Sequence, residues 1–91
     1  MRLYISVLGG DLNKIENLID CAIGEFLISQ ATSYWGEGDL VVVETGESDV
    51  DKLVDYIWKW LPYKYKKSHD IRFYRGVPPG QGMRLVDHIL W

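Results

Sequence analysis

Residues Thr32–Thr45, TSYWGEGDLVVVET, place two β-prone runs on either side of a glycine-rich acidic tip. The run before the tip, Phe26–Trp35, is predicted to form one long strand, and the β-branched run Leu40–Thr45 the next. The turn is Gly36-Glu37-Gly38-Asp39, because glycine adopts the positive φ that tight connections need. The stretch therefore predicts a β-hairpin with a tyrosine and a tryptophan just before its tip.

The first part of the chain predicts a strand followed by an amphipathic helix. Arg2–Leu8 alternates its side chains between two faces, as a strand does. Asp11 suits the N-cap of the helix, and Gly24 suits the left-handed position just past its end. A helix that continues to Ser29 is the alternative, because Phe26 also fits the apolar stripe. The stripe consists of Leu12, Ile15, Leu18, Ile19, Ala22 and Ile23.

The second part predicts a helix, a strand and a C-terminal element. Ser48-Asp49-Val50-Asp51 resembles an N-cap with acids favoured by the helix dipole, and Pro62 ends the helix. A polar loop then leads to the strand Ile71–Arg75. After the loop 77–82, residues 83–90 predict a short helix, with an edge strand as the alternative. The apolar stripe of the second helix consists of Val50, Leu53, Val54, Ile57 and Leu61.

The element order is β-α-β-β-α-β, which predicts a single α+β domain over residues 1–91 with a ferredoxin-like fold. In that fold an antiparallel sheet carries both helices on one face, and here a short C-terminal helix follows. The strands are apolar on both faces, since Val41 and Val43 alternate with Leu40 and Val42. An apolar sheet face without helices usually marks an interface, so the sequence predicts an oligomer.

The composition restricts the class and the location of the protein. The chain has 91 residues, 47% hydrophobic and 25% charged, which is typical of a globular domain. No apolar run approaches the roughly 20 residues that span a bilayer, so no membrane association is expected. The single cysteine, Cys21, cannot form an internal disulfide, which favours a cytoplasmic location. We expect Cys21 to be a buried structural thiol, because it lies in an apolar helix pattern.

The charge is divided between the two parts of the chain. Residues 1–58 contain three basic and eleven acidic side chains, a net charge of −8. Residues 59–91 contain seven basic and two acidic side chains, a net charge of +5. Such a division is typical of a polyanion site or of attraction between opposite ends of neighbouring protomers.

Several segments from about Ser33 onward occur in an order that a known family shares: Ser33-Tyr34-Trp35, Leu40–Thr45, Glu47-Ser48, Leu61–Lys64, Ile71–Tyr74, Gly80-Gln81-Gly82 and Leu85–Ile89. In these segments the sequence resembles the CutA family, small trimeric divalent-ion tolerance proteins related in fold to the signalling protein PII. The resemblance covers roughly two-thirds of the chain and implies a homotrimer built on the sheet and the hairpin. It implies no metal site, because Leu61 and Lys64 stand where the family has the histidine and the glutamate of its His-Pro-Tyr-Glu turn.

Catalytic and metal-binding patterns are absent from the sequence. It contains no Ser-His-Asp order with a nucleophile elbow, no suggestive Cys-His pairing and no Gly-Lys-Ser phosphate loop. His69 and His88 have no His, Cys or Glu partner at helical spacing, so we predict no metal ligands among them. We therefore predict a protein without enzymatic activity and without a cofactor.

The function predicted from the sequence is binding or regulation by an oligomer that resembles CutA, with a trimer favoured. Interface residues are expected at Tyr34, Trp35, Val41 and Val43. A small anionic ligand or a protein partner is expected in the clefts between protomers. The candidate ligand-binding residues are Lys64, Arg75 and Arg84.

Two alternatives remain open. Residues 58–75 interleave aromatic with basic side chains, as proteins that bind single-stranded nucleic acid or nucleotides do. The acidic balance of the whole chain counts against nonspecific DNA binding, which depends on neutralising phosphates. The other alternative is a small inhibitor or adaptor that docks on another protein.

Overall fold

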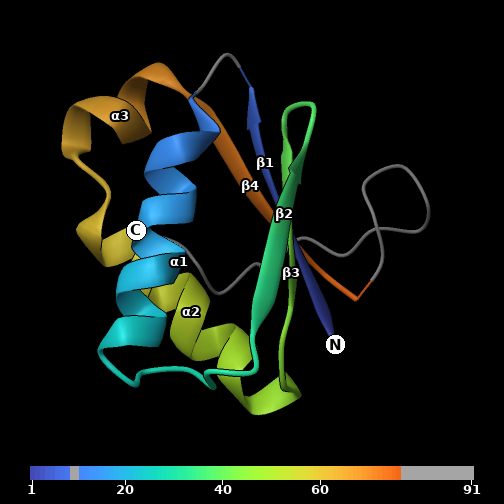
Figure 1. The fold of residues 1–91 in the computed structure, drawn as a ribbon. Coiled ribbons are helices and arrows are strands. Elements are labelled where there is room, and N and C mark those ends of the chain that lie inside the picture. Colours follow the sequence, from blue (N-terminus) through green and yellow to red (C-terminus); the bar gives the residue numbers. More distant parts are fainter. Residues whose placement is uncertain (9–10, 77–91) are drawn as a thin grey trace.

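The computed structural model describes residues 1–8 and 11–76. Within them, helices lie on one side of a four-stranded sheet (Figure 1). The strand order is β2-β3-β1-β4 and every neighbouring pair is antiparallel, which confirms the predicted ferredoxin-like α+β class. The elements are β1 (Arg2–Leu8), α1 (Leu12–Gly24), β2 (Ser33–Glu37), β3 (Leu40–Glu44), α2 (Glu47–Trp60), α3 (Tyr63–Ser68) and β4 (Asp70–Arg75).

The strand register decides which side chains form the core beneath the helices. Ile5 of β1 is paired with Val41 of β3 on one side and with Phe73 of β4 on the other. Because side chains alternate along a strand, residues two positions away share that face. Helices α1 and α2 supply the opposing layer from apolar positions spaced three and four apart. These helix residues are Ile15, Ile19 and Ala22 from α1 and Val50, Leu53, Val54 and Ile57 from α2.

The connection between α1 and β2 differs from the prediction. Helix α1 includes Gly24, and Phe26, not a glycine, adopts the positive φ of 59°. The amides of Phe26 and Leu27 donate to the carbonyls of Ile23 and Ala22, both at 3.0 Å, which is the Schellman pattern of a helix end. Turns occupy the residues that follow, so the strand predicted from Phe26 begins only at Ser33.

The turn at the tip of the hairpin is shorter than the sequence predicted. Gly36 still belongs to β2, opposite Val41, and the turn consists of Gly38 and Asp39. Gly38 has a φ of 62°, which confirms the prediction that a glycine supplies the positive φ of this turn.

The segment after α2 contains the largest error in the predicted elements. Pro62 ends α2 as expected, but residues 63–68 form the helix α3 instead of a polar loop. Helix α3 has no buried residue, so it lacks the apolar stripe by which a helix is recognised in sequence. The loop 77–82 and the C-terminal helix or edge strand predicted for 83–90 lie outside the described residues.

The sheet face opposite α1 and α2 carries none of the described helices, and we call it the face without helices; it has a small cluster of its own. Tyr4 lies opposite Val42 and Tyr74 in the register, and these three side chains are 7%, 2% and 4% exposed. The centre of this face is therefore already buried within the single chain. This corrects the expectation of an uncovered apolar face. Among the helices that the structure describes, none has the length and apolar composition needed to cross a membrane.

Candidate functional site

The predicted interface residues lie on two different faces of the sheet. Trp35 lies opposite Val42 on the face without helices, and it is 39% exposed. The guanidinium carbon of Arg2 lies 5.5 Å from the centroid of its ring. Val41 and Val43 face the helices and are fully buried, so the structure corrects their expected place on the open face. An interface role for any of these residues stays a prediction.

Tyr34 also faces the helices, because it precedes Trp35 in the strand. Its hydroxyl donates to Asp20 Oδ1 of α1 at 2.6 Å and so ties the edge strand β2 to that helix. This hydrogen bond, with a smaller effect of burial, raises the pKa of Tyr34 to about 12. The bond holds the phenol in its protonated form, because ionisation would place two negative charges side by side.

A pH dependence follows for the variant Tyr34→Phe. The unfolded chain releases the phenol proton near pH 10 and the folded protein near pH 12. The stabilisation is therefore complete below pH 10 and is lost as the pH rises through about 12. We expect Tyr34→Phe to lower the free energy of unfolding by about 1 kcal/mol at pH 9. The expected loss is no larger because water screens a partly exposed hydrogen bond. Urea unfolding should show a smaller difference at pH 11.5.

The matched control is Tyr63→Phe, since the Tyr63 side chain is 69% exposed. It should leave the free energy of unfolding unchanged at both pH values. A destabilisation by Tyr34→Phe that stayed constant from pH 9 to pH 11.5 would contradict the assigned hydrogen bond.

The structure does not bring the three predicted ligand-binding residues together within one chain. Lys64 lies on α3, which leads into the start of β4, whereas Arg75 lies at the end of β4. Five steps of about 3.3 Å separate the ends of β4 by roughly 17 Å. Arg75 Nη2 donates to Asp51 Oδ1, and Arg84 lies outside the described residues. A cleft between protomers that unites these residues stays a prediction.

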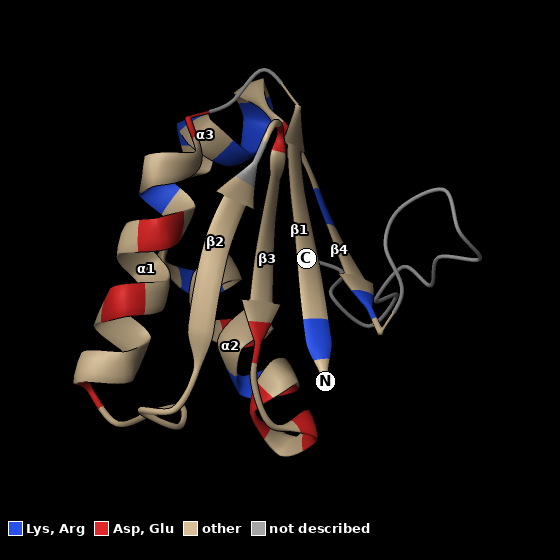
Figure 2. Ribbon diagram, turned by 45° about the vertical axis from the view of Figure 1, so that its right-hand side comes forward, with Lys and Arg blue, Asp and Glu red and all other residues tan. Residues whose placement is uncertain are grey.

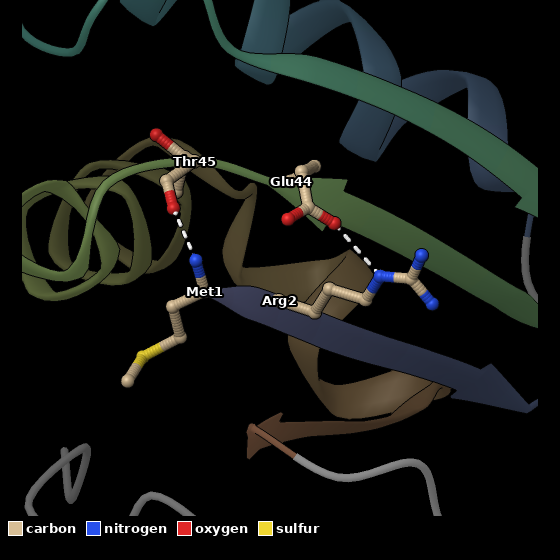
Figure 3. Close-up of polar contacts among 4 residues, drawn as sticks. All are labelled: Met1, Arg2, Glu44 and Thr45. Carbon is tan, nitrogen blue, oxygen red and sulfur yellow. Dashed lines mark hydrogen bonds and ion pairs between the residues drawn. The ribbon is translucent and has the colours of Figure 1, made fainter.

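One surface hollow, of about 210 Å³, lies beside the first turn of α2. Its hydroxyls are already engaged, since Thr32 Oγ1 and Thr45 Oγ1 are 2.6 Å apart. The Met1 amine donates to Thr45 O at 2.8 Å, and Arg2 Nε donates to Glu44 Oε2 at 2.7 Å (Figure 3). Its described lining residues include no lysine or arginine. The residues that line this first hollow are Ser29, Ala31, Thr32, Glu44, Thr45 and Gly46.

A second hollow, of about 200 Å³, lies between α1 and the chain that joins α2 to α3. Its α1 residues share one face of that helix because they are three or four positions apart. Cys21 lines this hollow and is exposed, which corrects the expectation of a buried thiol. The described lining residues are Lys14, Asn17, Leu18, Cys21, Trp60 and Pro62.

Lysines and aromatic residues alternate along the end of α2 and along α3, and Lys14 and Trp60 both line the second hollow. We call this set the lysine–aromatic surface: Lys14, Trp58, Lys59, Trp60, Tyr63, Lys64, Tyr65, Lys66 and Lys67. Lys14 Nζ lies 5.8 Å from the Tyr65 ring centroid, and Lys59 Nζ lies 5.6 Å from the ring of Trp60. On α3 the same arrangement recurs, with Lys66 Nζ 4.7 Å from the Trp58 ring and Lys67 Nζ 5.0 Å from the Tyr63 ring. Each ammonium group lies within the range of a cation–π contact.

Three contacts hold α3 in this position. The Tyr65 hydroxyl donates to Asp11 O at 3.0 Å, just before α1. Lys66 Nζ donates to Trp58 O of α2 at 3.2 Å. The Tyr65 ring stacks on His69 with centroids 4.1 Å apart. Burial raises the pKa of Tyr65, as does the nearby negative charge of Asp11.

The three lysines of α3 place positive charge at one end of the molecule (Figure 2). Figure 2 shows the basic segments of α3 beside the start of α1, while acidic segments gather toward the end of α1 and the start of α2. In residues 1–8 and 11–76, no ion pair involves Lys14, Lys59, Lys64, Lys66 or Lys67. Sequence analysis found the alternation in residues 58–67 but missed Lys14, which only the packing of α1 brings there.

The part of the chain that the structure describes contains no group of three or more His, Cys, Asp or Glu side chains suited to a metal ion. His69 is occupied by its neighbours, since its Nδ1 lies 2.9 Å from Ser68 Oγ and 3.0 Å from Tyr65 O. His88 lies outside the described residues.

Comparisons with known protein families, with curated proteins and with solved structures find no match for this chain. The resemblance to CutA therefore stays a proposal.

Proposed function

We propose that this protein is a non-enzymatic binding or regulatory protein that binds an anionic ligand at the lysine–aromatic surface. The observation that carries the proposal is a set of lysines from α1, α2 and α3 that lie over aromatic rings, none of them in an ion pair among the described residues. The chain as a whole is acidic, with a net charge of −3, whereas this surface carries five lysines.

Electrostatics and packing both favour an anion at this end. Like charges repel one another, and an anion placed among them relieves that repulsion and attracts each of them. The lysines extend over aromatic rings while their ammonium groups reach water, where a ligand can contact them. Lys64, which the sequence indicated as a ligand-binding residue, belongs to the lysine–aromatic surface. Arg75 does not belong to it, and its guanidinium contacts Asp51.

Removal of three exposed lysine charges tests the proposal. The triple variant Lys59→Gln, Lys64→Gln, Lys67→Gln keeps the side-chain length, and polyphosphate serves as the anionic probe. Exposed ionic contacts contribute about 0.5 to 1 kcal/mol each, so affinity should fall roughly 10- to 100-fold at 0.1 M salt. The slope of log affinity against log salt should become shallower by about 2, close to 0.7 for each lost contact.

The matched control is Lys52→Gln, a lysine of α2 whose Nζ lies 4.0 Å from Asp49. It should leave polyphosphate binding and its salt slope unchanged. Equal affinities for the control and the triple variant, or no binding of polyphosphate by the unmodified protein, would overturn the proposal.

Assembly into a CutA-like homotrimer is a second candidate, and it is compatible with binding at the lysine–aromatic surface. The order of the matching segments supports it, as does the exposed indole of Trp35 on the face without helices. Against it stands the burial of Tyr4, Val42 and Tyr74 within the single chain. The adaptor hypothesis also stays a prediction.

A further inference from the structure

We propose that the hollow beside Trp60 takes a planar nucleobase, so that the anion bound at the lysine–aromatic surface is a nucleotide or a single-stranded nucleic acid. This inference rests on the proposed function and specifies its ligand.

The size of the hollow limits what enters it. Its volume of about 200 Å³ is below the range of roughly 300 to 1,000 Å³ that encloses most of a drug-sized ligand. One ring system fits, and the rest of the ligand stays outside. Any charged part of the ligand therefore lies outside the hollow, whose nearest lysines are Lys14 in its lining and Lys59 over the Trp60 ring.

The lining of the hollow matches a base better than it matches a simple anion. Trp60 contributes an indole that is 57% exposed, a surface on which a planar ring stacks. Leu18 adds an apolar contact, and the Asn17 amide offers both a donor and an acceptor to the edge of a base. An inorganic anion needs none of these three groups. Lys14 completes the lining with a positive charge.

The surroundings place positive charge where phosphates attached to the base would lie. Lys59 Nζ lies over the Trp60 ring, 5.6 Å from its centroid, and Lys14 extends from the hollow toward Tyr65 on α3. Beyond them, the exposed ring of Tyr63 has Lys67 over it, which repeats the pairing of aromatic ring and cation. Alternating stacking surfaces and lysines are how proteins hold single strands without sequence preference.

Cys21 provides a direct readout, because it lines the hollow and is the single cysteine of the chain. The rate at which N-ethylmaleimide alkylates it in the folded protein is measured by mass spectrometry. Four probes are compared: adenosine monophosphate, an eight-nucleotide oligoadenylate, ribose 5-phosphate and polyphosphate. We expect the two base-bearing probes to slow alkylation at least fivefold, and ribose 5-phosphate and polyphosphate to leave the rate within twofold.

The variant Trp60→Ala removes the stacking surface. It should raise roughly 5- to 100-fold the concentration of base-bearing probe needed to protect Cys21 from alkylation, while polyphosphate still binds. The matched control Trp35→Ala removes an exposed tryptophan from the other face of the sheet and should leave protection unchanged. If Trp60→Ala lowers the urea midpoint, Asn17→Ala replaces it, with a smaller loss of protection expected.

The outcomes separate this inference from the proposed function. Protection by the oligonucleotide at a much lower concentration than by the mononucleotide supports a single strand, and equal concentrations support a free nucleotide. No protection by either base-bearing probe, or equal protection by polyphosphate, overturns the base site. If polyphosphate binding persists in that case, the proposed function stands alone.

Discussion

Replacing Val42 with aspartate should unfold the protein or lower its free energy of unfolding by about 4 kcal/mol or more. Val42 is 2% exposed and lies between Trp35 and Tyr4 in the register of the sheet, so a carboxylate there would lie without a partner among apolar groups. An unpaired buried charge costs several kcal/mol, and a domain of this size has only about 5 to 15 kcal/mol in total. Urea unfolding measures the loss, which should shrink toward pH 4 because a protonated carboxyl is less costly to bury.

Leu40→Asp is the matched control, on the same strand and the same face but only partly buried. It should cost much less than Val42→Asp. An unchanged urea midpoint for Val42→Asp would mean that this face is open to water in solution.

Sedimentation equilibrium of the unmodified protein and of Leu40→Asp tests whether the protein forms a trimer. A mass of three chains would support the CutA-like assembly. The mass of one chain would show that the buried cluster of Tyr4, Val42 and Tyr74 needs no second copy.

Leu53→Ala should lower the free energy of unfolding by about 2 to 5 kcal/mol, the usual cost of deleting a buried leucine side chain. Leu53 is fully buried on α2, in the core between the helices and the sheet. The cost combines the lost burial with the cavity left behind, since a packed core collapses only in part. Urea unfolding with an unchanged slope in denaturant would show that stability, and not the compactness of either state, has changed.

The control for Leu53→Ala is Asp55→Ala, an exposed position two residues further along α2. It should change the free energy of unfolding by less than about 0.5 kcal/mol. A loss below about 1 kcal/mol for Leu53→Ala would place this side chain outside the core.

The errors of the sequence analysis share a physical origin. Cys21 was expected to be buried, but it lies one position from Ala22, about 100° around a helix whose buried face is centred on Ile15 and Ile19. Composition alone placed Cys21 in an apolar helix, and only its helical phase shows that it faces outward. The strand predicted from Phe26 failed because hydrogen bonds at the end of α1 engage Phe26 and Leu27 locally.

The candidate site was only partly predictable for a related reason. The alternation of aromatic and basic residues between Trp58 and Lys67 is visible in the sequence and indicated a binding surface. That α3 is a helix was not visible, because it buries no side chain and leaves no apolar period. Lys14 and Asn17 lie far away in the chain, and no local pattern connects them with Trp60.

By itself the sequence determined the ferredoxin-like class, the order of the elements apart from α3, and the helix positions that face the core, because periodicities of two and 3.6 residues record which side of an element meets apolar neighbours. Only the tertiary structure decided that Tyr4, Val42 and Tyr74 are buried on the face without helices, and that one face of α1 forms a hollow with Trp60. The buried cluster depends on the strand register, and the hollow depends on how the helices pack. Register and packing arise from contacts between residues that are distant in the chain, and local spacing does not record such contacts.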